Sequence, residues 1–509
     1  MEGKGFTRIV ALGIVLAAVC AGPASAGARG DVAVIVVPAS SPVFVSPRAA
    51  HGLLVVGEGA TISRRGALAS LLTGEVGNAV LHGGVPRGKP RIALDRHPAR
   101  TTFYVALPPP GRHHNVVRYP IAVVGPGYQG LLTSSGTHLD GLITIWDVAP
   151  SALALARGER PRIRSRPAAD PVAYLERFDR RLSRAHDSRK GATLVVVGLM
   201  VVLGLLALAA RSALLGRAAF LAAPVCLVVS LVLSAADVTA PTEVVVVMAL
   251  IGCGLALACG SLLRPRLWLA LGLLALFAFV FAVLWAEPGW NSVAALGARP
   301  DGGGRFYGIN NQVATGLLCP ALVLGALSGP GALPAVALAV SAGIGVSSIG
   351  ANGGCLLTYL AGFLVLGFRL RAARAGPFRV AAATAVVAAA ALALVGIDAA
   401  LGGSSHVTHA VAGGPSTLAG DFAHRIHLSA AFIVSRWYEA LLFAVSVAAL
   451  VWLSFRRPRL AVLDALLVAL AVSLLVNDTP TDIAVLGALS ALVLWAWLRR
   501  SGERLTPLH

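Results

Sequence analysis

Charged side chains are scarce in this chain of 509 residues. Only 13% of the residues are charged, whereas 57% are hydrophobic and the mean hydropathy is +0.78. Soluble globular proteins carry about 25% charged residues. The composition therefore excludes a soluble multidomain protein and indicates a polytopic α-helical membrane protein.

Acidic residues are the scarcer of the two charged classes, 23 against 42 lysines and arginines, which gives a net charge of +19. Nucleic-acid binding needs a basic stripe interleaved with aromatic residues, and the sequence has none. Its arginines lie instead at the ends of apolar segments and in one N-terminal region. We therefore expect no nucleic-acid partner, and expect membrane lipid head groups or an anionic envelope polymer as counter-charges.

Cysteines are few, and all of them lie in apolar runs: Cys20, Cys226, Cys253, Cys259, Cys319 and Cys355. The polar region from Gly27 to Lys190 has none. A disulfide framework and a thiolate zinc site are therefore excluded in that region.

The N-terminus has the pattern of a secretory signal. Lys4 and Arg8 precede an apolar run from Ile9 to Ala21, and residues 24–26 form a small-x-small Ala-Ser-Ala motif. This pattern predicts a signal peptide over residues 1–26. An uncleaved anchor is the alternative. Either way, we expect a multi-pass protein of the plasma (inner) membrane whose next domain is extracytoplasmic.

Residues 27–190 are predicted to form a small extracytoplasmic α/β domain. Short apolar, β-branched runs bounded by glycine or proline predict buried strands at residues 32–37, 53–56, 103–107 and 120–124. Ser63 is expected to cap a helix that ends near Leu72. The region holds 22 lysines and arginines against 11 acidic residues. Long exported segments tolerate such an excess, because their translocation depends little on charge.

The end of this domain is predicted to be a basic amphipathic helix. Val172, Leu175, Phe178 and Leu182 recur at helical spacing, with arginines between them. Such a helix can dock on anionic head groups or pack against its own domain, and the pattern does not choose between the two.

Eleven apolar segments follow, each near the length that crosses about 30 Å of hydrocarbon. They lie near residues 192–210, 218–236, 243–263, 267–286, 312–328, 332–350, 353–370, 380–400, 438–455, 460–476 and 483–498. The arginine-rich connections alternate with polar ones and lie at residues 211–217, 264–266, 369–379, 456–459 and 499–504. The positive-inside rule places these connections in the cytoplasm. The transmembrane domain is thus expected over residues 191–500, with a cytoplasmic tail at 501–509.

The first polar loop, residues 287–312, is predicted to form part of a binding site. Its glycine-rich stretch lets a ligand approach the backbone, and the planar guanidinium of Arg305 suits phosphate or carboxylate. The side chains expected to line the cavity are Tyr307, Asn310, Asn311 and Gln312. Helix capping with interhelical packing is the alternative for the amides, because buried amides need hydrogen-bond partners.

Two short polar turns are expected beside that loop. Asn352 lies in the turn 350–354 and is either a cavity residue or a simple turn residue. Asn477 and Asp478 begin the turn 477–482, which ends at Asp482. A pair of carboxylates there could bind a cation or supply a base, with Asp478 as the catalytic candidate, or it could cap a helix.

The fourth polar loop spans residues 401–438 and holds two His-x-x-His pairs, His406/His409 and His424/His427. Either pair could bind a transition metal with Asp421, but without cysteine or a His-Glu-x-x-His pattern we expect no metal. The preferred interpretation makes His424 or His427 a general base and lets Arg425 and Arg436 hold phosphate. A solvated loop is the remaining alternative. The sequence does not identify a cofactor.

One segment carries a family resemblance. Residues 131–153, LLTSSGTHLDGLITIWDVAPSAL, run from an expected strand through Asp147-Val148-Ala149-Pro150-Ser151 into a helix. This resembles the closing segment of alkaline-phosphatase-superfamily domains, where a strand leads through Asp-x-Ala-Pro-Thr into a helix. Together with residues 304–311, GRFYGINN, it resembles bacterial envelope proteins that join such an exported domain to a polytopic one.

The resemblance implies a two-metal site of Asp and His residues with a Ser or Thr nucleophile. The first strand of this chain, however, ends at Pro38 without an aspartate, and about 164 residues are few for that fold. We therefore expect a degenerate, non-catalytic relative that binds a substrate or a partner.

The layout as a whole resembles that of oligosaccharide ligases and polymerases of bacterial envelopes, by analogy only. The leading hypothesis is assembly or modification of a cell-envelope glycopolymer by transfer from a polyprenyl-phosphate-linked donor at the extracytoplasmic face. A transporter or flippase is the first alternative. Against it, the sequence shows no internal repeat and few charges at mid-membrane depth other than Asp464. A non-enzymatic scaffold is the second alternative.

Overall fold

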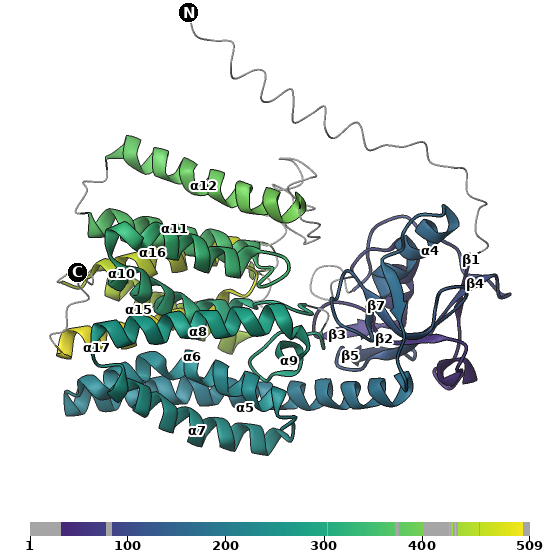
Figure 1. Cartoon of the computed structure of the whole chain (residues 1–509), viewed down its shortest axis with the longest axis horizontal. Helices are drawn as coiled ribbons and strands as arrows, with labels where there is room; N and C mark the ends of the chain where they lie inside the picture. Colours follow the sequence, from purple (N-terminus) through teal and green to yellow (C-terminus); the bar gives the residue numbers. More distant parts are fainter. Residues whose placement is uncertain are drawn as a thin grey trace, which may run out of the picture.

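In the computed structural model, a sheet domain packs on one end of a bundle of long helices (Figure 1). The structure describes residues 32–77, 84–302, 304–371, 376–400, 427, 429–430, 433, 436–457 and 459–501. The predicted signal peptide and most of the fourth polar loop lie outside these residues. The coarse prediction of a mostly helical chain with many apolar helices and an N-terminal α/β region is confirmed.

The sheet domain is built on one mixed sheet of seven strands, in which β1, β4, β6, β2, β7 and β9 are neighbours in that order and β8 pairs with β2. Its strands are β1 Val32–Val36, β2 Ala50–Val55, β4 Thr101–Val105, β6 Tyr119–Val124, β7 Gly130–Ser134, β8 Leu142–Thr144 and β9 Ile163–Arg166. β1 runs parallel to β4, whereas β6 is antiparallel to both β4 and β2. Strands lie at all four predicted positions, and β7, β8 and β9 are additional.

Short helices and a separate two-stranded ribbon complete this domain. They are η1 Pro42–Val45, α2 Arg64–Thr73, η2 Ile145–Asp147 and α4 Val148–Ala156, with the ribbon of β3 Thr61–Ser63 and β5 Arg112–His114. The Ser63 hydroxyl accepts a hydrogen bond of 3.1 Å from the backbone N–H of Gly66. The predicted N-cap of this helix is thus confirmed.

One continuous helix, α5 Pro171–Ala210, joins the sheet domain to the bundle. Its 40 residues span about 60 Å at 1.5 Å per residue. The expected amphipathic helix and the expected first span are therefore one element, and the predicted boundary at residue 190 lies inside it. Leu175, Phe178 and Leu182 are buried at no more than 8% exposure. The apolar face of α5 thus packs against protein, as one of the two alternatives proposed.

The arginines on the N-terminal part of α5 also bind protein groups. Arg181 makes a 2.9 Å ion pair with Asp237, and Arg184 donates a 2.9 Å hydrogen bond to the hydroxyl of Thr239. Both partners lie in the connection after α6, so these contacts hold α5 against the bundle.

Over the residues that the structure describes, the bundle consists of α5 and nine further long helices. They are α6 Ala213–Ala235, α7 Pro241–Leu262, α8 Arg266–Ala286, α10 Asn311–Gly345, α11 Gly353–Leu370, α12 Pro377–Ala400, α15 Trp437–Ser454, α16 Ala461–Val476 and α17 Pro480–Ser501. The short α9, Pro288–Val293, precedes α10. Eight helices among the described residues are long and apolar enough to cross a membrane, whereas α12 and α16 have shorter apolar stretches. Each of the eleven predicted segments overlaps one of these helices, and the largest difference is at 332–350, which extends five residues beyond the end of α10 at Gly345.

Helix α10 reverses direction at its middle. Gly329 has non-helical backbone angles, φ 75° and ψ 171°, and Pro330 follows it. The backbone N–H of Ile309, just before α10, donates a 2.8 Å hydrogen bond to the carbonyl of Gly350, just after it. A straight helix of 35 residues would separate these ends by about 52 Å. Two of the expected segments therefore form a helical hairpin whose turn lies at the uncharged sequence 328–331.

Arginines from several predicted cytoplasmic connections meet at the end of the bundle opposite the sheet domain. Arg369 and Arg459 both pair with Asp464, at 2.9 and 3.1 Å. Arg371 donates to the carbonyl of Pro330 in the α10 turn. Asp464 lies in the first turn of α16. Its expected position at mid-membrane depth is therefore wrong. Its carboxylate lies at a helix end and pairs with two arginines.

Candidate functional site at the junction of the sheet domain and the bundle

The loop 287–312 lies under the sheet domain and is largely buried. Asn291 and Ser292 of α9 are at most 4% exposed, and their side chains donate to the carbonyls of Gly308 and Phe306, each at 2.8 Å. The loop is thus folded back on itself by its own buried polar groups, which gives the following residues a defined geometry.

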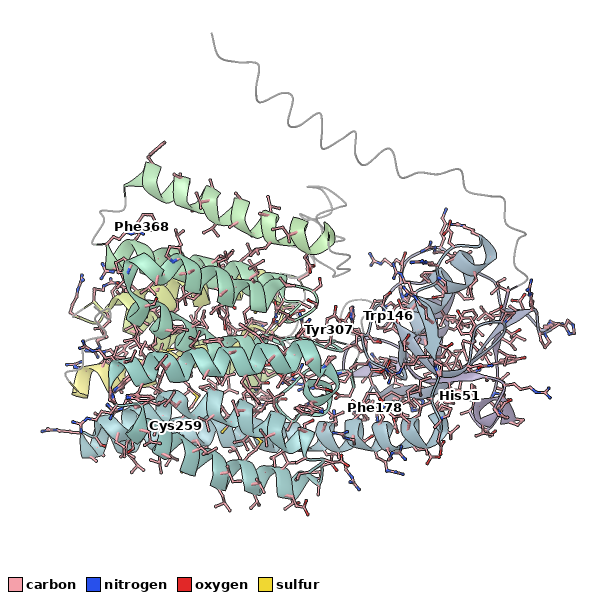
Figure 2. The ribbon with its side chains drawn as sticks, in the orientation of Figure 1. His51, Trp146, Phe178, Cys259, Tyr307 and Phe368 are labelled. Atoms are coloured by element: carbon pink, nitrogen blue, oxygen red, sulfur yellow. The ribbon has the colours of Figure 1, made fainter. Side chains whose placement is uncertain are left out.

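Aromatic contacts join this loop to the sheet domain. The ring of Tyr307 lies 4.3 Å from that of His138, and Phe306 lies 6.3 Å from Trp146, between ring centroids. Figure 2 shows Tyr307, Trp146 and Phe178 at the junction. Phe306 belongs to an apolar cluster drawn from both parts of the chain: Val55, Leu139, Leu142, Phe178, Leu182 and Val293. The segments 131–153 and 304–311, which carry the family resemblance, therefore pack directly on each other.

A buried ion pair holds the same loop to α5. The carboxylate of Asp301 is 6% exposed and binds the guanidinium of Arg189 and the imidazole Nδ1 of His186. Burial alone would raise the pKa of Asp301, but the bond from His186 and the charge of Arg189 outweigh it and lower that pKa. Arg189 also donates to the carbonyl of Ala298 at 2.9 Å. Asp301 therefore anchors the loop as a charged carboxylate at neutral pH.

Arg305 and Gly308 bring the loop against the turn between α10 and α11. The Arg305 guanidinium donates a 3.0 Å hydrogen bond to the carbonyl of Ala351. Gly308 has a φ of 75°, and a Cβ there would lie 2.4 Å from the carbonyl oxygen of Gly350. Only glycine fits both the angle and the contact.

Four amides and a carboxylate from three loops lie together at this end of the bundle and are here called the amide network: Asn310, Asn311, Asn352, Asn477 and Asp478. Hydrogen bonds between side chains join three of them, Asn352, Asn311 and Asp478. Asn352 donates to the side-chain oxygen of Asn311 at 3.0 Å, and Asn311 donates to Asp478 at 2.9 Å and to the hydroxyl of Thr479 at 3.1 Å. Thus the polar loops before α10, α11 and α17 converge at the sheet-domain end of the bundle.

Three members of the amide network are engaged in structural roles. Asn310 caps α10 through the N–H of Val313, at 2.7 Å, and Asn352 caps α11 through that of Cys355, at 3.0 Å. Asn477 is 1% exposed and donates to the hydroxyl of Ser473 at 2.9 Å. For Asn310 the structure thus shows the capping that was the alternative to ligand binding, whereas Asn352, expected as a cavity or turn residue, caps the helix that follows its turn. Asn311 and Asp478 are less buried than these three.

Gln312 connects three elements. Its side-chain oxygen accepts from Arg299, and its amide donates to the hydroxyl of Thr193 on α5 at 3.1 Å. It also lines a small, mainly apolar gap of about 30 Å³ between α5, α6, α10 and α17.

The structure describes only a few residues of the fourth polar loop, and one of them, Ser429, donates a 3.2 Å hydrogen bond to the backbone carbonyl of Asn477. His424 and Arg425 lie outside the described residues, and so do His406, His409 and Asp421. His427 is exposed. Arg436 donates to the Tyr438 hydroxyl at 2.9 Å and pairs with Glu439 at 3.3 Å. Within the described part of the chain these contacts of Arg436 are local, so it is not brought to the amide network.

Three polar residues of the junction had no sequence pattern to identify them. His138 has a positive φ of 53°, and its ring contacts that of Tyr307 at an angle of 42° between the ring planes. Asp398, near the end of α12, accepts hydrogen bonds from the backbone and the hydroxyl of Ser347. Arg299 forms a backbone bridge with Arg305. For Asp398, its position in an otherwise apolar helix was the only available signal. The contacts of His138 and Arg299 depend on tertiary packing.

Asp147, which begins the Asp-Val-Ala-Pro-Ser motif of the segment 131–153, has a structural role. Asp147 is 1% exposed and accepts from the hydroxyls of Ser134 at 2.6 Å and Thr144 at 2.7 Å. It thereby ties the ends of β7 and β8 to the start of α4. Over the described residues, no three His, Cys, Asp or Glu side chains lie together as metal ligands would.

Comparisons with known proteins add no family. No family model, no curated protein and no solved structure matches this chain.

Proposed function

We propose that this protein transfers a group from a lipid-linked donor during assembly or modification of a cell-envelope polymer, at the extracytoplasmic face of the plasma membrane. The observation that supports this proposal is the convergence of three polar loops on one end of the bundle, beneath the sheet domain. Arg305, the carbonyl of Ala351, Asn352, Asn311 and Asp478 follow one another there in a connected series.

The chemistry assigned to this end of the bundle needs a base and a phosphate-binding cation. Asp478 would take the proton of an acceptor hydroxyl, whose oxygen then attacks the donor carbon as the bond to the diphosphate breaks. Arg305 would hold the departing diphosphate, which leaves on its lipid. Asn311, bonded to both Asp478 and Asn352, positions the carboxylate. The sheet domain would bind the growing polymer or a partner protein.

A non-enzymatic envelope scaffold is the second candidate. It is favoured by the capping roles of Asn310 and Asn352, because side chains that hold helix ends are not available to a ligand. In that case the junction serves only to hold the sheet domain on the bundle.

The test compares envelope glycopolymers and lipid-linked precursors in cells that lack the protein and in cells complemented with variants. Arg305→Ala and Asp478→Asn should each leave precursor accumulated and polymer lost, whereas wild type restores the polymer. Arg371→Ala, at the opposite end of the bundle, is the matched control and should restore it too. Full rescue by both site variants would refute the transferase and favour the scaffold. Precursor trapped in the cytoplasmic leaflet would instead indicate a flippase.

A further inference from the structure

Three aromatic side chains with polar ring atoms lie at the junction of the sheet domain and the loop 287–312 (Figure 2). They are His138 and Trp146 of the sheet domain and Tyr307 of the loop. His138 contacts Tyr307, and Trp146 contacts Phe306, the chain neighbour of Tyr307. His138 is exposed, and Trp146 and Tyr307 are half-buried. The three rings thus form a partly open aromatic surface across the domain boundary.

The polar atoms of these rings have no hydrogen-bond partner within the part of the chain that the structure describes. They are the ring nitrogens of His138, the indole N–H of Trp146 and the hydroxyl of Tyr307. The indole N–H and the hydroxyl are not among the buried unpaired atoms, so both are open to solvent. By contrast, the hydroxyls of the buried Tyr128 and Tyr359 each donate to a backbone carbonyl. The rings at the junction can therefore bond to a ligand.

The turn that carries His138 holds it in a backbone conformation that favours glycine, with a φ of 53°. Thr137 is fully buried and donates a 2.6 Å hydrogen bond to the carbonyl of Leu142, and the N–H of His138 donates to the carbonyl of Ser134 at 3.1 Å. Such strain persists where the surrounding structure enforces it, and it is concentrated at binding sites. Glycine would fit this backbone, so the turn does not itself require an imidazole.

Two opposite charges lie beside the hydroxyl of Tyr307. Burial raises the pKa of Tyr307, the positive charge of Arg305 lowers it, and the negative charge of Asp398 raises it further. Arg305 also donates to the carbonyl of Ala351, the first contact of the series that leads to Asp478. The aromatic surface therefore adjoins the end of the bundle to which the transfer is assigned, and it extends that site onto the sheet domain.

A sugar unit matches this surface. The C–H face of its ring is apolar and packs on aromatic rings, whereas the hydroxyls at its rim need hydrogen-bond partners such as the open ring atoms. We propose that His138, Trp146 and Tyr307 bind a sugar unit of the growing polymer. The proposal rests on the proposed function. It deepens that function by assigning a saccharide, rather than a partner protein, to the sheet domain.

The test measures binding and does not depend on transfer. Purified full-length protein in detergent is titrated with fluorescently labelled tetrasaccharides released by mild acid from the envelope glycopolymers of the source cells. Trp146→Ala should weaken binding about tenfold or more, because it removes an aromatic anchor. Tyr307→Phe should weaken it about fivefold through the loss of one hydrogen bond. His138→Gly should also weaken it about fivefold, while it relieves the backbone of the turn.

Two matched variants serve as controls. Trp285→Ala removes a 70% exposed tryptophan at the end of α8, and His97→Gly removes an exposed histidine elsewhere on the sheet domain. Both should bind as wild type does. Thermal unfolding checks the folding of every variant. If Trp146→Ala unfolds, His138→Gly and Tyr307→Phe still test the proposal, because neither removes a packed side chain from the apolar cluster of the junction.

The outcomes separate this proposal from the proposed function. Failure of wild type to bind the tetrasaccharides, or equal binding by wild type and the three ring variants, would overturn the saccharide site even if the cells show a transferase defect. Displacement of the probe by an excess of tetra-alanine would overturn the choice of a saccharide over a peptide. Binding that depends on the rings, in a protein whose Asp478→Asn variant fully restores the polymer in cells, would support the saccharide site and refute the assigned transfer.

Discussion

The buried carboxylate of Asp301 should be the main electrostatic attachment between α5 and the loop 287–312. Asp301→Asn keeps the shape of the side chain and removes its charge. Arg189, whose side chain is only 10% exposed, would then lose its counter-charge. Breaking a buried ion pair from one side costs about 3 kcal/mol or more, because the remaining charge stays desolvated. We expect a loss of that order in the free energy of local opening.

Hydrogen exchange of the amides at residues 181–190 and 298–302 measures that opening. The pKa of Asp301 is lowered in the folded protein, so its contribution is complete above the unfolded pKa of about 3.8 and is lost as pH falls through the folded pKa. The difference between wild type and Asp301→Asn should thus be constant from about pH 5 to about pH 8. Below about pH 3.8 it should shrink by about 1.4 kcal/mol per unit.

Two variants control this experiment. Asp140 pairs with Arg166 at a more exposed site, and burial outweighs that arginine and raises the pKa of Asp140. Asp140→Asn should therefore change the opening little. The double variant Arg189→Met with Asp301→Leu removes both charges and should recover much of the loss. An Asp301→Asn effect below about 1 kcal/mol, within the range of surface pairs, would refute the anchoring role.

Three further predictions concern single side chains, each checked by unfolding of the purified protein. Gly308→Ala should lower the free energy of unfolding by about 2 kcal/mol or more, because it places a Cβ at a φ of 75° and against the Gly350 carbonyl. Gly304→Ala should leave that free energy unchanged, because a Cβ at position 304 would meet no atom within 4 Å. Asn352→Ala should cost about 2 kcal/mol through the lost cap of α11 and the lost bond to Asn311, and Asn352→Asp, which keeps the capping oxygen, should cost less. Tyr128→Phe should cost about 1 kcal/mol at neutral pH by removing the bond to the Ile163 carbonyl. Burial raises the pKa of Tyr128 to about 12, so wild type should lose stability as pH rises from 10 towards 12, and the phenylalanine variant should lack that part of the loss.

The predictions succeeded where local pattern decides structure. Apolar runs located the strands β1, β2, β4 and β6, and Ser63 capped α2 as expected. They failed where a contact distant in sequence decides the role of a residue. Asp464 sits in an apolar segment, but its position beside Arg369 and Arg459 shows that it lies at a helix end.

The candidate site was predictable in its residue types and not in their roles. Polar residues at the membrane edge indicated that Asn310, Asn311, Asn352 and Asp478 have partners, because unsatisfied amides there are costly. Which of them cap helices depends on the backbone direction at each helix start. Capping by Asn310 and Asn352, and the link from Asn311 to Asp478, therefore became visible only in the folded chain.

By itself, the sequence determined the class of this protein, since too few charges and too many long apolar segments leave no soluble fold open to it. It also determined the sheet domain and the turns between helices, because glycine, proline and β-branched residues act locally. Only the tertiary structure decided that α5 runs unbroken through the domain boundary, that Asp301 anchors a loop to it, and that three polar loops meet at one end. These features depend on residues far apart in the chain, such as Asp301 and Arg189, which are separated by 112 positions and whose proximity no local pattern specifies.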